Sequence, residues 1–244
     1  MTKLLSISLL LALSTIFFAC KSDPKSSSTP TGETVNIKTI EDIQVQYYAR
    51  YIADEKELKA EASFFSKSKE DEKMSITFSS VLLNDNPMRL DQSDSKRSYY
   101  KLNQKGEAPS RMAFQMISEQ GKKEEDVIVI PELKDFSFGK KLSPSKDGFL
   151  TWKGNPLGDK ESLVFLFTNE KDRTTSTILN GPTVKSELII PASKIKNLEP
   201  GNHRVYIVRK NRFIETKKGR DGTPREIKAL TEYYSKTIEV EVSN

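Results

Sequence analysis

The chain has 244 residues, 30% of them charged, and a formal net charge of +5. This length is sufficient for two domains of ordinary size. A charge balance this close to neutral does not indicate a nucleic-acid partner. One cysteine and one histidine are too few for a disulfide framework, and too few for a structural zinc site, which uses about four such ligands.

The first 19 residues have the layout of a secretory signal peptide. Lys3 supplies a positive charge, and the run from Leu4 to Ala19 contains no charged residue. A small residue, Ala19, directly precedes Cys20, the only cysteine of the chain. Together these features are typical of an export signal. The apolar run has 16 residues (19 − 4 + 1), fewer than the ~20 of a membrane-spanning helix, which argues against a transmembrane anchor.

The segment Phe17-Phe18-Ala19-Cys20 resembles the lipobox of bacterial lipoproteins. In that family the signal is cut before the cysteine, whose thiol is diacylated and whose new amine is usually acylated as well. The resemblance implies that Cys20 is the lipid attachment site and that the protein is anchored in the bacterial cell envelope, at the outer membrane, on either the periplasmic or the surface side. Phe17 stands where the family usually has leucine, and Phe18 is bulkier than the usual small residue. The alternative is an ordinary cleaved signal peptide, with Cys20 present by chance.

Residues 20–33 follow as the expected anchor and tether. The stretch from Ser22 to Glu33 is rich in Ser, Thr and Pro and lacks large apolar residues. Such a composition is typical of a flexible linker. Its twelve residues (33 − 22 + 1) can span at most ~40 Å.

From residue 34 the hydrophobic pattern changes to period two, which predicts β-strands. A turn is expected at Asn84-Asp85-Asn86-Pro87, where turn-forming residues are concentrated. The expected strands of residues 34–139 are Ile43–Tyr51, Leu58–Phe64, Met74–Ser79, Ser98–Leu102, Arg111–Ile117 and Val127–Ile130. Regularly spaced short strands favour a β-sandwich for this first domain.

A second β-sandwich domain is expected over residues 140–244, with the boundary inside the Pro- and Gly-containing segment 131–148. One helical turn is expected within Ala192–Leu198. The expected strands are Phe149–Trp152, Ser162–Thr168, Thr175–Leu179, Ser186–Ile190, His203–Phe213 and Thr237–Val242. The predicted fold class is therefore all-β, with two tandem antiparallel sandwiches.

The second domain also resembles fibronectin type III and related immunoglobulin-like domains. Leu198-Glu199-Pro200-Gly201 and the alternating stretch Arg204–Val208 match the region where those domains have a leucine, a Pro-Gly pair and a strand. Trp152 stands early, as their core tryptophan does, whereas Arg204 replaces their usual tyrosine. The resemblance implies a fold only, because this architecture hosts many unrelated functions.

Few residues indicate catalysis or metal binding. The single histidine, His203, follows a Pro-Gly turn at a strand start, and no nucleophile elbow accompanies it. Asn84, Asp85, Asn86, Asp91 and Asp94 are rich in oxygen ligands, but their spacing fits no known calcium loop, and a polar hairpin explains them as well. We expect no catalytic residue, no metal site and no cofactor.

A basic segment lies between Arg204 and Lys228, with nine basic and three acidic residues (9 − 3 = +6). It is interpreted as a long hairpin with Glu215–Glu226 as its loop. Such a hairpin is either a solvated surface or a site for an anionic lipid, lipopolysaccharide or acidic partner. The candidate polyanion-binding residues are Arg209, Arg212, Lys217, Lys218, Arg220 and Arg225.

The expected function is that of a non-enzymatic, lipid-anchored cell-envelope protein that acts as a binding or structural module. Its expected partners are the membrane, through the N-terminal lipid, and an envelope protein or glycan. A carbohydrate-binding surface lipoprotein is the first alternative and requires exposed aromatic side chains in a coplanar row. A carboxylate-dependent hydrolase is the second and requires two acids with shifted pKa values in one pocket.

Overall fold

The computed structural model describes residues 43–66, 74–94, 97–139, 141–219, 222 and 224–243. Cys20, the expected signal peptide, the expected tether and Arg220 lie outside these residues. The described chain is almost entirely β-structure, which confirms the all-β sandwich prediction. The one helix, α1, spans Ala192–Ile195 and lies where one helical turn was expected.

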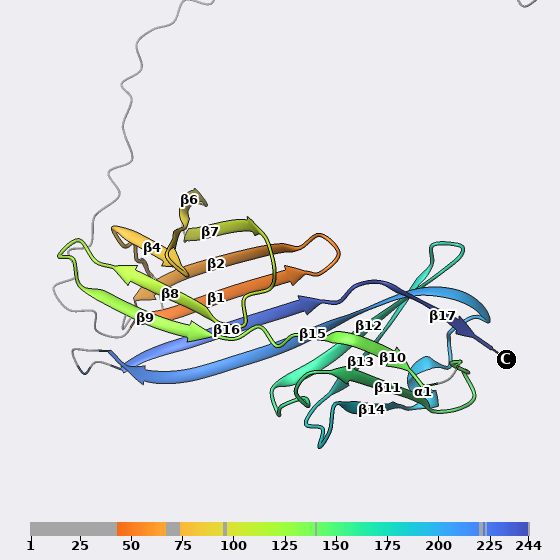
Figure 1. Cartoon of the computed structure of the whole chain (residues 1–244). Helices are drawn as coiled ribbons and strands as arrows, with labels where there is room; N and C mark the ends of the chain where they lie inside the picture. Colours follow the sequence, from red (N-terminus) through yellow and green to blue (C-terminus); the bar gives the residue numbers. More distant parts are fainter. Residues whose placement is uncertain are drawn as a thin grey trace, which may run out of the picture. The chain divides into compact units, whose positions relative to one another are not determined.

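The strands form three sheets (Figure 1). The large sheet has ten strands in the order β13-β12-β15-β16-β1-β2-β7-β6, with β17 beside β15 and β3 beside β2. Its strands are β1 (Ile43–Ile52), β2 (Glu57–Ser66), β3 (Met74–Ser75), β6 (Arg89–Asp94), β7 (Arg97–Lys105), β12 (Glu161–Asn169), β13 (Thr174–Asn180), β15 (Gly201–Lys218), β16 (Pro224–Tyr234) and β17 (Ile238–Val242).

Two smaller sheets complete the described structure. The four-stranded sheet has the order β5-β4-β8-β9, and the three-stranded sheet has the order β10-β11-β14. Their strands are β4 (Ser80–Leu83), β5 (Asn86–Pro87), β8 (Met112–Ile117), β9 (Lys123–Ile128), β10 (Lys134–Phe138), β11 (Gly148–Lys153) and β14 (Glu187–Ile190).

A parallel pair, β1 with β16, joins the two ends of the chain inside the large sheet. Its register runs from Gln44 opposite Glu226 to Ile52 opposite Tyr234. All other pairs between the named strands are antiparallel. Because β16 follows residue 140 and β1 precedes residue 139, the large sheet continues across the expected domain boundary. The division into two domains stays a prediction.

The longest strand, β15, holds this arrangement together. On one side it pairs with β12 over residues 203–211. On the other side it pairs first with β17 over residues 201–205 and then with β16 over residues 208–218. The long β15–β16 hairpin was predicted, but its loop is shorter than the expected Glu215–Glu226. Lys217, Lys218 and Arg225 therefore lie in strands and not in the loop.

The hydrophobic core lies on one face of the large sheet. At one end the rings of Tyr47 on β1 and Phe114 on β8 stack with their centroids 4.2 Å apart. At the other end the ring of Phe138 on β10 packs against that of Phe165 on β12, and the two ring centroids are 6.4 Å apart. The strand registers place the side chains of Tyr47 and Phe165 on the same face of the large sheet. The two smaller sheets therefore cover the same face, and their buried residues form one core cluster.

Local sequence signals explain several connections. Asn84 and Asp85, between β4 and β5, have φ angles of 47° and 64°, as a tight hairpin turn requires. The expected turn at this position is therefore present.

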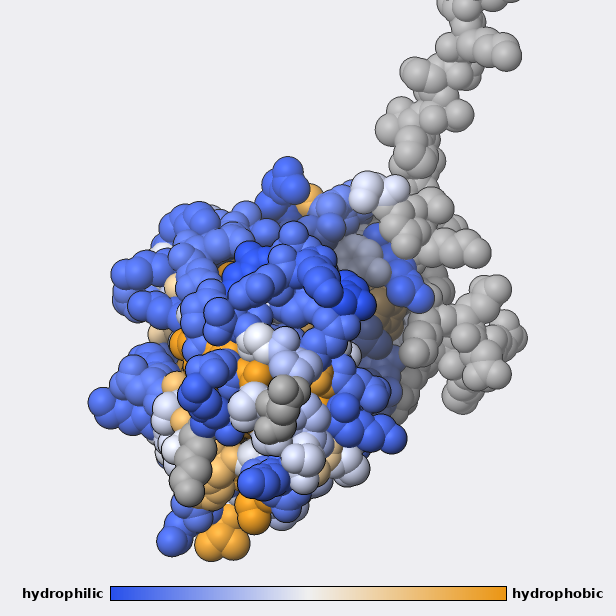
Figure 2. All heavy atoms as spheres, turned by 90° about the vertical axis from the view of Figure 1, so that its right-hand side faces the viewer, coloured by the Kyte–Doolittle hydropathy of each residue, from blue (hydrophilic) through white to orange (hydrophobic). Residues whose placement is uncertain are grey.

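The surface viewed in Figure 2 is mostly hydrophilic and contains smaller hydrophobic areas. Phe149 on β11 and Ile189 on β14, which form an exposed cross-strand pair, are among the exposed apolar residues of the three-stranded sheet.

Candidate functional site

The face of the large sheet opposite the core presents a group of tyrosine and charged side chains. We call this group the open face. It consists of Tyr48, Arg50 and Ile52 on β1, Leu230, Glu232 and Tyr234 on β16, and Tyr206, Val208 and Lys210 on β15. None of these nine side chains belongs to the hydrophobic core cluster of the described residues, although Val208 and Glu232 are themselves buried. Their positions follow from strand alternation, because side chains at every second position point to the same side of a sheet.

Glu232 is the centre of the polar contacts on the open face. Its carboxylate accepts hydrogen bonds from Tyr48 Oη at 2.9 Å and from Tyr234 Oη at 3.2 Å. Lys210 Nζ lies 2.8 Å from the other carboxylate oxygen. Burial alone would raise the pKa of Glu232, but the hydrogen bonds from Lys210 and Tyr48 outweigh it, so the pKa is lowered. Glu232 is therefore ionised at neutral pH and holds three side chains in place.

Two tyrosine rings and a guanidinium lie beside this carboxylate. The rings of Tyr206 and Tyr234 have centroids 6.3 Å apart and an angle of 29° between their planes. The guanidinium carbon of Arg50 lies 5.8 Å from the centroid of the Tyr234 ring. All three side chains are half-buried. Half-buried rings next to fixed charges offer a flat apolar surface together with hydrogen-bonding groups.

The adjacent tyrosine pairs behave as strand alternation predicts. Tyr233 is buried on the core face of β16, whereas its neighbour Tyr234 is half-buried on the open face. Tyr100 on β7 is likewise buried, and Tyr99 is half-buried. One tyrosine of each pair is therefore part of the core.

Arg209, one of the six candidate polyanion-binding residues, is buried. Its side chain is 2% exposed. One guanidinium nitrogen donates to the carbonyls of Glu132 and Asn155 at 3.0 and 3.1 Å, and the other donates to the carbonyl of Pro156 at 2.9 Å and to Glu161 Oε2 at 2.6 Å. These internal acceptors occupy both terminal nitrogens of the guanidinium group, Nη1 and Nη2. Arg209 is a structural residue here, and the prediction that it lies on a surface for anions is corrected.

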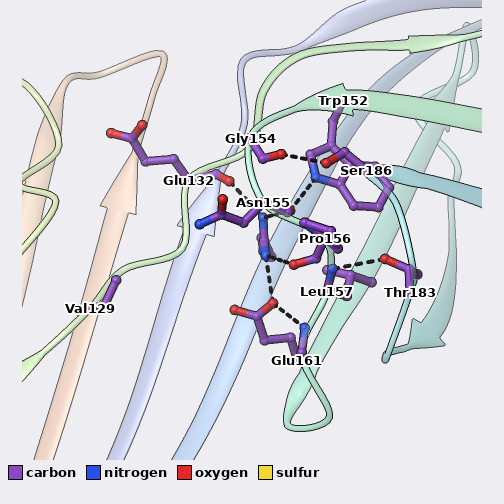
Figure 3. Close-up of polar contacts among 12 residues, drawn as sticks. Val129, Glu132, Trp152, Gly154, Asn155, Pro156, Leu157, Glu161, Thr183 and Ser186 are labelled. Carbon is purple, nitrogen blue, oxygen red and sulfur yellow. Dashed lines mark hydrogen bonds and ion pairs between the residues drawn. The ribbon is translucent and has the colours of Figure 1, made fainter.

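The loop that supplies these carbonyls is itself fixed by hydrogen bonds. The indole nitrogen of Trp152 donates to the carbonyl of Asn155 at 2.9 Å, and the backbone N–H of Leu157 donates to Thr183 Oγ1 at 3.0 Å. Both contacts are drawn in Figure 3. Trp152 is thus a core residue, as expected, and it also positions the acceptors of Arg209.

Arg225 is buried as well, in a polar group between β16 and β9. It pairs with the carboxylate of Asp126, which also accepts a hydrogen bond from Tyr47 Oη at 2.7 Å. The carboxylate of a second acid, Glu124, lies 3.9 Å from the Arg225 guanidinium. Burial raises the pKa of Asp126, although Arg225 and the hydrogen bond from Tyr47 oppose this effect. The prediction for Arg225 is corrected for the same reason as that for Arg209, because its charge is neutralised inside the protein.

The other predicted residues are separated from these two. Arg212 and Lys218 are exposed on β15. Lys217 is half-buried and lies 3.4 Å from Glu215. Arg220 and Cys20 lie outside the described residues, so their predicted roles stay predictions. The basic segment is therefore not one continuous patch.

His203 is buried at the start of β15. Its Nε2 lies 2.8 Å from the carbonyl of Glu199 in the preceding turn. This contact fastens the turn to the strand. Among the described residues no group of three or more His, Cys, Asp or Glu side chains is arranged to hold a metal ion.

A cavity of about 390 Å³ lies beside the stacked rings of Tyr51 and Tyr233. Its acids are engaged in ion pairs. Lys56 lies 2.7 Å from Glu107, and Lys134 lies 2.7 Å from Glu132. The hydrogen bond and charge of Lys56 lower the pKa of Glu107. A carboxylate-dependent hydrolase needs a proton donor with a raised pKa, and the shift at Glu107 is in the opposite direction.

No protein-family model matches the chain, and a search of curated proteins finds no match. Within the described part of the chain, no helix is long and apolar enough to cross a membrane. The open face was not predicted as a site. The sequence information that could have predicted it is the alternation in β1, β15 and β16. Tyr48, Tyr206 and Tyr234 all stand at positions that alternate with the core residues.

The role of Glu232 predicts a dependence of stability on pH. The lowered pKa means that the unfolded chain binds a proton at this residue more readily than the folded chain. Its stabilising contribution, about 1 kcal/mol, is present above the usual pKa of 4.5 and is lost as the pH falls below it. We expect Glu232→Gln to lower the free energy of unfolding at pH 7 and to have less effect near pH 3, as measured by urea denaturation. An equal effect at both pH values would contradict this account.

The buried ion pair gives a second prediction. Arg225→Met leaves the Asp126 carboxylate without its counter-charge, and we expect it to lower the free energy of unfolding by about 3–5 kcal/mol. Arg212→Met is the matched control, because Arg212 is exposed on the neighbouring strand of the same hairpin, and it should change stability little. Equal effects of the two substitutions in thermal unfolding would show that Arg225 is not engaged internally.

Proposed function

We propose that this protein is a non-enzymatic, lipid-anchored component of the bacterial cell envelope that binds another envelope component through the open face. The observation that carries the proposal is the group of three half-buried tyrosines around Glu232, Lys210 and Arg50, on a sheet face outside the core cluster. The lipid anchor is proposed from the resemblance of the N-terminal segment to a lipobox, with Cys20 as the attachment site.

The physical properties of the open face support a binding role. Tyrosine combines a large apolar ring with a hydroxyl group and loses little conformational freedom on binding, which is why it is common in protein interfaces. Here the rings of Tyr48 and Tyr234 stand on neighbouring strands and are held by hydrogen bonds to Glu232, so the positions of these two rings are set before a partner arrives. Such preorganisation lowers the entropic cost of association.

A carbohydrate is the second candidate ligand, and the paired rings of Tyr206 and Tyr234 favour it. Their planes differ by 29°, so together they offer an apolar surface on which the face of a sugar ring can pack. The charges of Arg50 and Lys210 supply hydrogen-bond donors for hydroxyl oxygens next to that surface. The protein would then act in glycan capture at the cell surface.

The anchor is tested by intact mass and membrane partitioning. We expect the chain expressed in a Gram-negative host to lose residues 1–19, to gain the mass of its acyl chains and to fractionate with membranes. Cys20→Ala should be unacylated and either soluble or unprocessed, because two or more acyl chains are needed for lasting attachment. If both proteins are cleaved, unacylated and soluble, the lipoprotein assignment is wrong.

The open face is tested with purified lipopolysaccharide, peptidoglycan and an array of bacterial glycans as probes. We expect Tyr206→Ala to weaken binding to the recognised probe about tenfold, because it removes one half of the ring pair. Tyr99→Ala is the matched control, since Tyr99 is a half-buried tyrosine on β7, two strands beyond β1. If glycans bind Tyr206→Ala as tightly as the unchanged protein, the carbohydrate candidate is excluded at this face.

A further inference from the structure

One side of β15 has no strand beside it over residues 212–218 in the described part of the chain. We call this stretch the free edge. The neighbouring strand β12 begins at Glu161, opposite Asn211, and the chain before it turns away. That turn is closed by the N–H of Glu161, which donates to the carbonyl of Gly158 at 3.1 Å. β15 therefore extends past the start of β12 by seven residues (218 − 211).

The backbone direction at the free edge follows from two hydrogen bonds. The N–H of Arg212 donates to the carbonyl of Lys160 at 3.1 Å, on the side of β12. The carbonyl of Ile207 accepts from the N–H of Ser235 at 3.0 Å, on the side of β16. Because alternate residues of an antiparallel strand direct their backbone groups to opposite sides, Ile214, Thr216 and Lys218 present their N–H and C=O groups to the free edge. No hydrogen bond from another described backbone group reaches them.

Exposed sheet edges are templates for pairing with another strand, and proteins usually keep them short or blocked. The free edge is neither short nor interrupted by proline, and Ile214 is 58% exposed on it. Such an edge is suited to strand addition, in which backbone hydrogen bonds supply affinity and alternate side chains supply specificity.

The charge of the free edge selects its partner. Arg212, Lys217 and Lys218 against Glu215 give the segment a net charge of +2 (3 − 1). A second copy of the chain, paired antiparallel about Glu215, would bring Arg212 opposite Lys218, and like charges directly opposite each other are destabilising. An acidic strand would instead place its carboxylates beside these cations.

A cavity of about 540 Å³ lies next to the start of the free edge. Glu161 and Arg209 form one wall, and Glu161 is directly opposite Asn211 in the strand register. Val129, which is 52% exposed, and Pro131 form an apolar part of the lining. A strand added to the free edge would direct alternate side chains toward this side of the sheet, where the cavity has room for an apolar one.

We propose that the free edge of β15 binds an extended acidic segment of a partner protein by strand addition. The segment runs antiparallel to β15, in line with β12, and pairs with Ile214, Thr216 and Lys218. Its apolar side chains lie toward Val129, and its carboxylates lie beside Arg212 and Lys218. This binding site is separate from the open face, because it uses the edge of the large sheet and not its surface.

The test uses the full chain and a short probe peptide of alternating valine and glutamate. We expect the peptide to bind and to shift the backbone amide NMR signals of Ile214, Thr216 and Lys218 more than those of Phe213 and Glu215, whose N–H groups point toward β16. A matched peptide of alternating valine and lysine should bind at least about tenfold more weakly, because its charge has the wrong sign.

Two substitutions at one position separate strand addition from simple charge attraction. Thr216→Pro removes an edge N–H but no hydrogen bond between β15 and β16, so it should fold and bind the acidic peptide at least about tenfold more weakly. Thr216→Ala keeps the N–H and should bind like the unchanged protein. Thermal unfolding is measured for both variants as the check that they are folded.

Other outcomes overturn the proposal. The free edge is not a strand-addition site if the acidic peptide fails to bind, or if Thr216→Pro and Thr216→Ala bind it equally. Vesicles containing phosphatidylglycerol provide a further probe. If they bind the chain, and Arg212→Gln removes both this binding and peptide binding while Thr216→Pro changes neither, the segment is a surface for anionic lipid instead.

Discussion

The parallel pairing of β1 with β16 is the interaction on which the rest of the structure depends. It joins strands from the two ends of the described chain, and the residues that it aligns, such as Gln44 and Glu226, are 182 positions apart. Without it the β2, β7 and β6 strands would have no connection to β15 and β12 in the same sheet. The open face exists because Tyr48 on β1 is brought next to Glu232 and Tyr234 on β16. The candidate site is therefore a product of long-range pairing and not of one local motif.

Two buried arginines strengthen this framework at different places. Arg209 ties β15 to the connection after β9 and to the loop before β12 through carbonyls of Glu132, Asn155 and Pro156. Arg225 ties β16 to β9 through Asp126. A buried guanidinium requires acceptors with fixed positions, because an unpaired charge inside a protein is costly. The two residues thus help to specify how β9, the segment after it and the loop before β12 lie on the large sheet. Because both charges are engaged internally, only the exposed cations of the basic segment are available to a partner.

Much of the local structure follows from the sequence. Alternation of apolar and polar residues predicts most strands, and the concentration of turn-forming residues predicts the Asn84-Asp85 turn. The same alternation contains the information that Arg209 points inward, since it shares its parity with Val205 and Ile207, and that Arg225 does, since it shares its parity with Ile227 and Ala229. The charge of these two arginines favours the surface, whereas their positions in the alternation favour the interior, and both are buried. The parallel pairing of β1 and β16 could not be predicted, because no local pattern records which distant strand supplies a neighbour.

The late position of β16 in the chain has a consequence for how the protein folds. The central strand β1 is synthesised well before its neighbour β16, because the paired residues Gln44 and Glu226 are 182 positions apart. Contacts between residues this far apart form slowly, because a long loop of chain must close before they contribute any stability. The large sheet therefore cannot be completed before β16 has been synthesised. A polypeptide with this topology therefore keeps one edge of β1 without its native partner until β16 has emerged.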